Sequence, residues 1–105
     1  MTLMSTSSAR KGFPETLSDF TEQEAGEYNA FKIKTDGNIN GIDAAWYMAE
    51  ETYEGQEYET LTYILDGGDE YVEIGFWLDG DNARTEADQI MIRISMLWPE
   101  KPYST

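Results

Sequence analysis

Residues 57–79 read EYETLTYILDGGDEYVEIGFWLD, and this stretch decides the expected fold. Two runs of alternating apolar side chains, residues 57–65 and 70–79, flank the turn sequence Asp66-Gly67-Gly68-Asp69. Adjacent glycines supply the positive φ that a tight hairpin turn requires, so this stretch is predicted to form a β-hairpin at the centre of a sheet.

A two-residue Gly-Gly loop predicts the register of this hairpin, with Leu65 opposite Glu70 and Tyr63 opposite Val72. Because side chains alternate along a strand, one face of the hairpin collects the large apolar residues and is the predicted core side. Its members are Leu61, Tyr63, Leu65, Val72, Ile74, Phe76 and Leu78. The other face is aromatic, polar and acidic, with Tyr58, Thr60, Thr62, Ile64, Tyr71, Glu73 and Trp77.

Three further segments show periodic patterns. Residues 28–35 alternate like a half-buried strand. Residues 41–54 are predicted to form a helix with Asn40 at its N-cap, since one side of the helical projection is apolar and includes Tyr53, and the other is acidic. Residues 83–98 alternate like a strand at three isoleucines, but their helical projection gives an apolar stripe, so a helix is favoured.

The resulting order of strand, helix, strand, strand, helix predicts a small α+β sandwich, in which an antiparallel sheet carries its helices on one face. Residues 13–27 are compatible with another short helix. A chain of 105 residues forms one domain, expected over residues 13–98. Flexible tails are expected at residues 1–12 and 99–105.

The composition excludes several chemistries. The chain has no Cys and no His, which excludes a disulfide framework, a Cys/His zinc site and the usual nucleophile pairs. Carboxylate pairs such as Glu50/Glu54 and Glu57/Glu59 are predicted on a solvated face, where acid and base pKa values do not separate. We therefore do not expect an enzyme. No apolar leader or run of about 18 apolar residues is present, so a cytoplasmic protein is expected.

The net charge of −14 is concentrated in one block. Residues 36–83 contain most of the acidic side chains and neither Lys nor Arg, whereas residues 84–105 carry no net charge. A general adaptation to high salt would spread acids over both segments. Direct binding to nucleic acid or to an anionic membrane is not expected, because the phosphates would be repelled.

The segment Asp36-Gly37-Asn38-Ile39-Asn40-Gly41 resembles the first half of an EF-hand calcium loop. The bidentate glutamate required at position 12 is replaced by Tyr47, and the preceding residues have a strand pattern. A strand-to-helix turn is therefore favoured over a calcium site, and no metal or other cofactor is expected.

The acidic block suggests mimicry of a nucleic-acid backbone. On the predicted helix, Asp43, Glu50 and Glu54 would lie about 10 Å and 6 Å apart, comparable to phosphates along a strand. The expected partner is a basic, nucleic-acid-binding protein, such as a nuclease or a restriction or CRISPR effector. In size and acidity the chain resembles phage anti-restriction and anti-CRISPR proteins and bacterial nuclease-immunity proteins, a likeness that covers no motif.

The candidate partner-binding residues are acids and three aromatic anchors. They are Asp43, Glu50, Glu51, Glu54, Glu57, Glu59, Asp66, Asp69, Glu70, Tyr58, Tyr71 and Trp77. Aromatic side chains supply most of the affinity in many interfaces. The alternative function is a non-enzymatic adaptor or chaperone-like module that binds a partner, or a second copy of itself, through the aromatic sheet face. A third interpretation is that another strand, the N-terminal segment or a second copy of the chain covers these aromatic residues.

Overall fold

The computed structural model describes residues 3–12 and 16–97. Its elements are β1 (Leu3–Arg10), α1 (Leu17–Glu27), β2 (Lys32–Ile39), β3 (Ile42–Tyr53), β4 (Gln56–Asp66), β5 (Glu70–Leu78) and α2 (Ala83–Leu97). The strands form one antiparallel sheet in the order β1-β5-β4-β3-β2, with β4 in the middle. The α+β class and the antiparallel sheet are confirmed.

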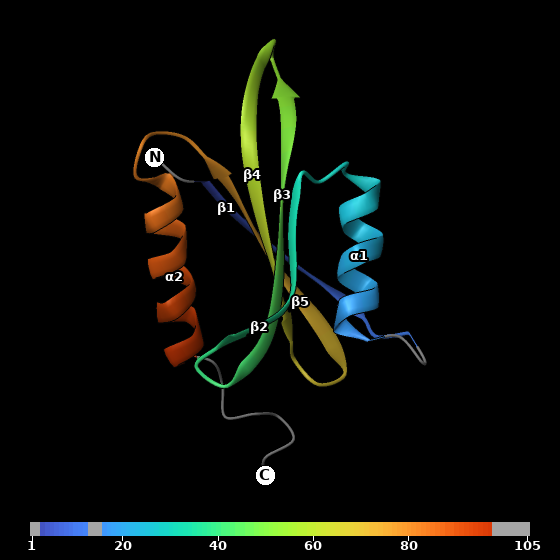
Figure 1. The fold of residues 1–105 in the computed structure, drawn as a ribbon. Coiled ribbons are helices and arrows are strands. Elements are labelled where there is room, and N and C mark those ends of the chain that lie inside the picture. The colour runs from blue at the N-terminus through green and yellow to red at the C-terminus, as the bar shows by residue number, and fades with distance from the viewer. Residues whose placement is uncertain (1–2, 13–15, 98–105) are drawn as a thin grey trace.

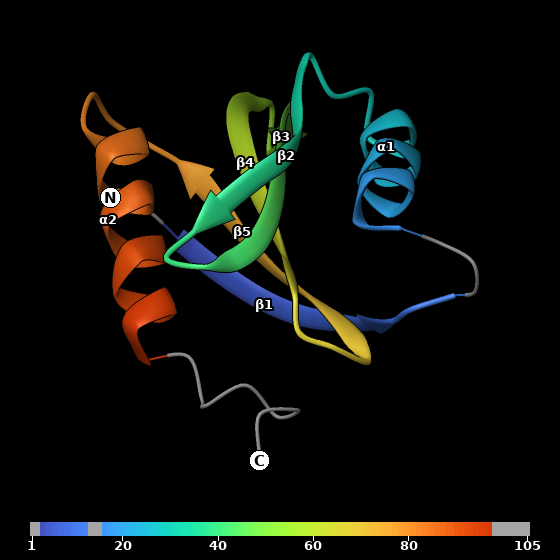
Figure 2. The same cartoon turned by 60° about the horizontal axis from the view of Figure 1, so that its bottom comes forward.

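The two helices cover opposite faces of the sheet (Figures 1 and 2). Helix α1 packs on a cluster that includes Tyr47, Ile64 and Tyr71, whereas α2 packs its Ala87 and Met91 on the other side. The prediction that the helices share one face is therefore wrong. Both faces of the central strands carry large apolar side chains, and each face needs a covering layer to exclude water.

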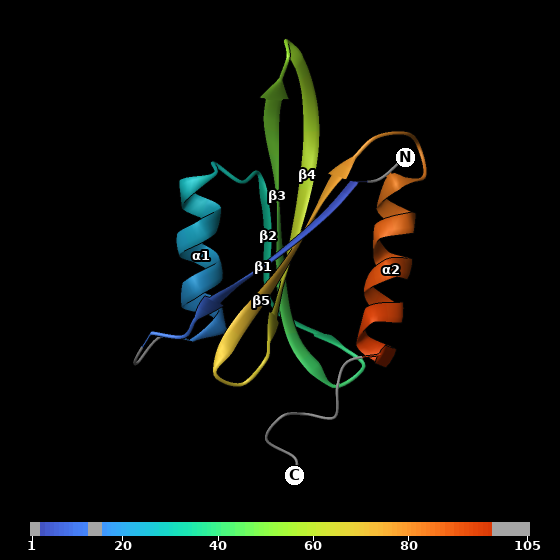
Figure 3. The ribbon, with the colours of Figure 1, turned by 180° about the vertical axis from the view of Figure 1, so that it is seen from behind.

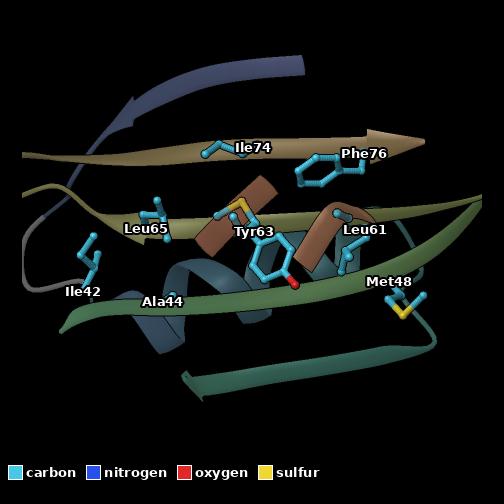
Figure 4. Packing of buried hydrophobic residues seen from close by; sticks show 10 residues of the cluster. Ile42, Ala44, Met48, Leu61, Tyr63, Leu65, Ile74 and Phe76 are labelled. Carbon is cyan, nitrogen blue, oxygen red and sulfur yellow. The ribbon is translucent and has the colours of Figure 1, made fainter. Parts of the chain in front are cut away.

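The main core lies between the sheet and α2 (Figure 4). Every residue predicted on the core face of the 57–79 hairpin contributes to it: Leu61, Tyr63, Leu65, Ile74 and Phe76 are buried, and Val72 and Leu78 pack against them. Met48 of β3 and Met91 of α2 complete the packing. The faces of this hairpin are therefore confirmed.

The register within the hairpin differs from the predicted one by two residues. Leu65 pairs with Val72 and Tyr63 with Ile74. The turn is centred one residue later than predicted, because the Gly67 backbone N–H donates to the Glu70 carbonyl at 2.9 Å and Gly68 and Asp69, rather than Gly67 and Gly68, lie between the strands. A shift of two residues leaves every side chain on its original face, which explains why the core prediction survives the error.

Residues 42–53 form strand β3, and the predicted helix over residues 41–54 is wrong. Asn40 and Gly41 have φ of 50° and 89° and connect the paired residues Ile39 and Ile42. Positive φ at both central residues is what a type I′ hairpin turn requires. The segment is therefore preceded by a hairpin turn rather than by a helix cap. The strand predicted at residues 28–35 is partly confirmed, because β2 covers residues 32–39.

The ends of the fold also differ from expectation. Residues 3–10 form edge strand β1 paired with β5, so the sheet includes residues that the sequence pattern assigns to a tail. The short helix compatible with residues 13–27 is present as α1, capped by Thr16, whose side chain accepts from the Asp19 N–H at 3.1 Å. The helix favoured at residues 83–98 is present as α2. The predicted tail over residues 99–105 lies outside the described residues.

Neither helix of the described chain is long and apolar enough to cross a membrane.

Candidate acidic and aromatic interface

The predicted site acids divide between two ends of the sheet. The β3–β4 hairpin projects beyond the helices (Figure 1), and the β4–β5 turn lies at the opposite end (Figure 3). We call the acids of the projecting hairpin the acidic tip; they are Glu50, Glu51, Glu54, Glu57 and Glu59. Asp43, Asp66, Asp69 and Glu70 belong to the other end, about 30 Å away along β4 at 3.3 Å per residue.

The spacing expected from a helix does not apply to these acids. On an extended strand, Asp43 and Glu50 are separated by about 23 Å at 3.3 Å per residue. Alternation also places them on opposite faces of the sheet, with Glu50 on the α2 side. The acidic tip therefore combines carboxylates from the ends of two strands and from the turn between them, with Glu50, Glu57 and Glu59 on the α2 side and Glu51 on the α1 side. Asp43 does not belong to it.

The acidic tip holds like charges close together. Glu50 lies directly opposite Glu59 in the β3–β4 register, and Glu57 follows opposite Thr52. Directly opposed like charges destabilise a sheet, by roughly 0.2–1 kcal/mol for a pair. Within residues 3–12 and 16–97, the ion pairs join Lys11 to Asp66, Lys34 to Asp36 and Arg84 to Asp88, and none involves the tip. The tip carboxylates therefore form no ion pair with a described Lys or Arg side chain.

An aromatic cluster adjoins the tip on the α1 side of the sheet. Trp77 packs against Tyr58, with ring centroids 5.4 Å apart, and edge-on against Tyr53 at 6.0 Å. We call Tyr53, Tyr58 and Trp77 the aromatic cluster. Tyr53 is 57% exposed. Sequence reasoning missed Tyr53 because the predicted helix turned it toward the core.

Tyr71 and Asp66 both make contacts within the protein: Tyr71 is buried, and Asp66 forms an ion pair. Tyr71 is only 1% exposed, because Phe20 of α1 stacks on it with ring centroids 4.6 Å apart. The Lys11 ammonium lies 5.1 Å from the Tyr71 ring and forms an ion pair with Asp66. The interpretation that the N-terminal segment covers aromatic residues is confirmed for Tyr71. This residue is not available to anchor a partner.

A polar pocket of about 190 Å³ opens beside Trp77 of the aromatic cluster, between the sheet and Tyr28, the residue that follows α1. We call it the hydroxyl pocket, since its lining includes Ser5, Ser7, Thr60, Thr62, Tyr28 and Tyr47, together with Glu51, Glu73, Gly75 and Trp77. Two of these hydroxyls come from β1, which the sequence pattern assigns to a tail. That assignment is why sequence reasoning did not find the pocket.

Glu24 of α1 faces this region and has an unusual titration. Burial raises the pKa of Glu24 from 4.5 to about 8, reinforced by a hydrogen bond to Glu73 and by the negative charge of Glu73. The Tyr47 hydroxyl donates to Glu24 Oε1 at 3.3 Å, which opposes the rise in this pKa. Burial also raises the pKa of Tyr47. Glu24 is therefore largely protonated at neutral pH and forms a hydrogen bond with Glu73.

This titration predicts a pH dependence of stability. The folded state binds the Glu24 proton more tightly than the unfolded chain, so the contribution is complete below pH 4.5 and is lost as the pH rises through about 8. Glu24→Gln is expected to gain stability relative to the wild type as the pH rises from about 4.5 to about 8, because the wild type loses the contribution of this proton over that range and glutamine does not titrate. Thermal unfolding across this range measures the difference. Glu27→Gln, at an exposed position of the same helix, is the control, and equal pH profiles for the two variants would contradict the assignment.

The segment that resembles a calcium loop has a structural role. Asp36 pairs with Lys34 at 3.2 Å, and the Gly41 N–H donates to Asn38 Oδ1 at 2.9 Å across the β2–β3 turn. Tyr47, at the position of the missing glutamate, is buried in the sheet. These residues build a turn between two strands, whereas the sequence favoured a turn into a helix.

No protein-family model, curated protein or solved structure matches this chain, so the surface chemistry of the tip, cluster and pocket is the basis for assigning a function.

Proposed function

We propose that the protein binds the basic, nucleic-acid-binding site of another protein and blocks it, using the acidic tip and the aromatic cluster as the contact surface. The observation that carries this proposal is the tip itself, where five carboxylates project on a hairpin and form no ion pair with the described Lys and Arg residues. Such an arrangement opposes folding, and a cationic partner would relieve it.

The two parts of this surface have different tasks. Long-range attraction between the tip and a basic groove accelerates association and orients the two proteins. The aromatic cluster supplies contact area that becomes desolvated on binding, because Tyr and Trp are large and rigid. Nucleic acid would compete for the same basic groove, since its phosphates and the tip carboxylates satisfy the same cations. The protein is a non-enzymatic inhibitor in this proposal.

An adaptor function is the second candidate, and the exposed ring of Tyr53 favours it. In an adaptor, the aromatic cluster would determine affinity and the charge would only keep the protein dissolved. The two candidates differ in the salt dependence of binding.

Charge reversal at the tip tests the proposal. Association is measured with purified nucleases, restriction enzymes and CRISPR effectors, with salt raised from about 50 mM to 500 mM. We expect the association rate to fall steeply with salt, and Glu54→Lys with Glu57→Lys to slow it severalfold. Duplex DNA is expected to compete. Trp77→Ala is expected to act mainly by faster dissociation.

The matched control is Asp69→Lys with Glu70→Lys, which makes the same charge change at the opposite end of the sheet. Equal effects of the two double variants would mean that only total charge matters, which contradicts a site at the tip. Binding that ignores salt and both charge reversals, yet is lost in Trp77→Ala, would replace the inhibitor with the adaptor.

A further inference from the structure

The floor of the hydroxyl pocket lies at Gly75, which has no side chain to fill the space. Ser5 of β1, Gly75 of β5 and Thr62 of β4 lie side by side in the sheet register, all on the α1 face. A Cβ at Gly75 would lie 3.2 Å from Ser5 Oγ and 3.8 Å from Thr62 Oγ1. Glycine at this position therefore leaves space between two hydroxyls that any other residue would fill.

The walls of the pocket combine carboxylates with aromatic rings. Two residues along β5 in either direction from Gly75 lie Glu73 and Trp77, which point to the same face. Glu51 of β3 adds a second carboxylate to the lining. On the α1 side, the Tyr28 ring stacks on Tyr47 at 6.1 Å. Among the residues that the structure describes, the lining contains no Lys or Arg.

The side chains that line the pocket favour a small cation with several hydrogen-bond donors. The volume of about 190 Å³ is below the range of roughly 300–1,000 Å³ typical of drug-sized ligands, and fits one side chain rather than a cofactor. Carboxylates attract a positive charge, hydroxyl oxygens accept hydrogen bonds, and Trp77 offers a ring face. A guanidinium is planar, carries five N–H donors and stacks on aromatic rings, whereas an ammonium is compact and strongly hydrated.

We propose that the hydroxyl pocket binds the guanidinium group of an arginine side chain, which the basic partner inserts between Trp77 and Glu73. That a partner provides the arginine rests on the proposed function; that the pocket accepts a guanidinium does not. The location supports the assignment, because Trp77 belongs both to the pocket lining and to the aromatic cluster beside the acidic tip.

An acid next to the pocket lining adds a pH signature. Glu24 of α1 forms a hydrogen bond with Glu73, which lines the pocket, and accepts one from the Tyr47 hydroxyl of β3, on whose ring Tyr28 stacks. A guanidinium beside Glu73 stabilises the ionised carboxylates, so binding releases the Glu24 proton. Guanidinium binding is therefore expected to be tighter at pH 9 than at pH 6.

The test is an NMR titration with N-acetyl-arginine-methylamide, followed at the Trp77 indole N–H at constant ionic strength. We expect a saturable shift, with the corresponding lysine compound binding at least about threefold more weakly, since it lacks the planar fork. Glu73→Gln is expected to weaken arginine binding severalfold. Glu86→Gln, the same charge change at an exposed position of α2 on the other face of the sheet, is expected to leave it within twofold of the wild type.

Two further variants fill the space without removing a charge. Gly75→Val blocks the floor from β5, and Ser5→Leu blocks it from the exposed edge strand, which tolerates a larger side chain. Either variant, shown to be folded by its thermal unfolding, is expected to abolish the saturable shift. Ser5→Leu decides the matter if Gly75→Val does not fold.

Three outcomes would overturn the assignment. They are the absence of a saturable shift, equal binding of the lysine compound, and unchanged binding in a folded variant with a filled pocket. A pocket that binds the arginine compound while no basic partner responds to the acidic tip would refute the proposed function alone. Salt-dependent partner binding at the tip without arginine binding would refute the pocket alone.

Discussion

Ile74→Asp is expected to unfold the protein. Ile74 is 2% exposed and lies in the main core opposite Tyr63, where α2 excludes water (Figure 4). An unpaired carboxylate at this position costs several kcal/mol, a large fraction of the roughly 5–15 kcal/mol that stabilises a domain. Circular dichroism at 25 °C, with thermal unfolding of any folded fraction, measures the loss.

Ile92→Asp is the matched control, with the same residue types and the same change in charge. Ile92 lies on α2 and is 50% exposed, so its carboxylate stays in contact with water. We expect this variant to remain folded, with a loss of about 1 kcal/mol or less. Similar destabilisation by the two variants would mean that the face assignment of β5 is incorrect.

Adding one methyl group to two different glycines is expected to change stability in opposite directions. A Cβ added to Gly26 or to Gly41 would have no non-neighbouring heavy atom within 4 Å, so packing does not decide the outcome. Gly41 has a φ of 89°, and Gly41→Ala is expected to lose about 1–2 kcal/mol from strain in the turn. Gly26 lies within α1, and Gly26→Ala is expected to gain about 0.5–1 kcal/mol.

Denaturant midpoints at an unchanged slope measure both effects. A neutral or stabilising Gly41→Ala would contradict the hairpin turn between β2 and β3. It would instead support the helix that the sequence pattern predicts for residues 41–54, since alanine favours a helix.

The faces of the 57–79 hairpin could be predicted from sequence because its two strands each have one clearly apolar face. The glycines marked a turn but did not fix its centre, which is why the register was wrong by two residues. Strand β3 could not be predicted, for a physical reason. Its residues Ala44, Ala45, Met48 and Ala49 are all buried, because α1 and α2 cover its two faces. A strand buried on both sides has no alternation, so its apolar positions also fit a helical projection.

The decisive signal for β3 was the dipeptide Asn40-Gly41 between Ile39 and Ile42. Asn is favoured both at helix N-caps and in type I′ turns, but the glycine that follows it favours the turn. Edge strand β1 had even less signal, since residues 4–8 are polar or exposed and their place in the sheet depends on pairing with β5. Such long-range pairing leaves no periodic pattern in the strand itself.

The candidate site was predictable in part. Composition identified the acids, and hairpin alternation placed Tyr58 and Trp77 on the α1 face of the sheet, where they lie. Alternation also placed Tyr71 there, but nothing local to it reveals that Phe20 covers its ring. The grouping of acids into two ends depends on the β3 and β4 strands being extended, and the predicted helix concealed it.

Gly75 lies between Ile74 and Phe76, two of the most buried side chains of the main core. The backbone that forms the pocket floor is therefore fixed by packing on the far side of the sheet, and it cannot shift without opening a cavity there. The pocket floor therefore has the same shape before and after a ligand binds. Binding then orders few protein residues, and the loss of conformational entropy is small. Substitutions that weaken the packing of α2 on the sheet should therefore lower the affinity of the pocket on the α1 side, although they touch no ligand.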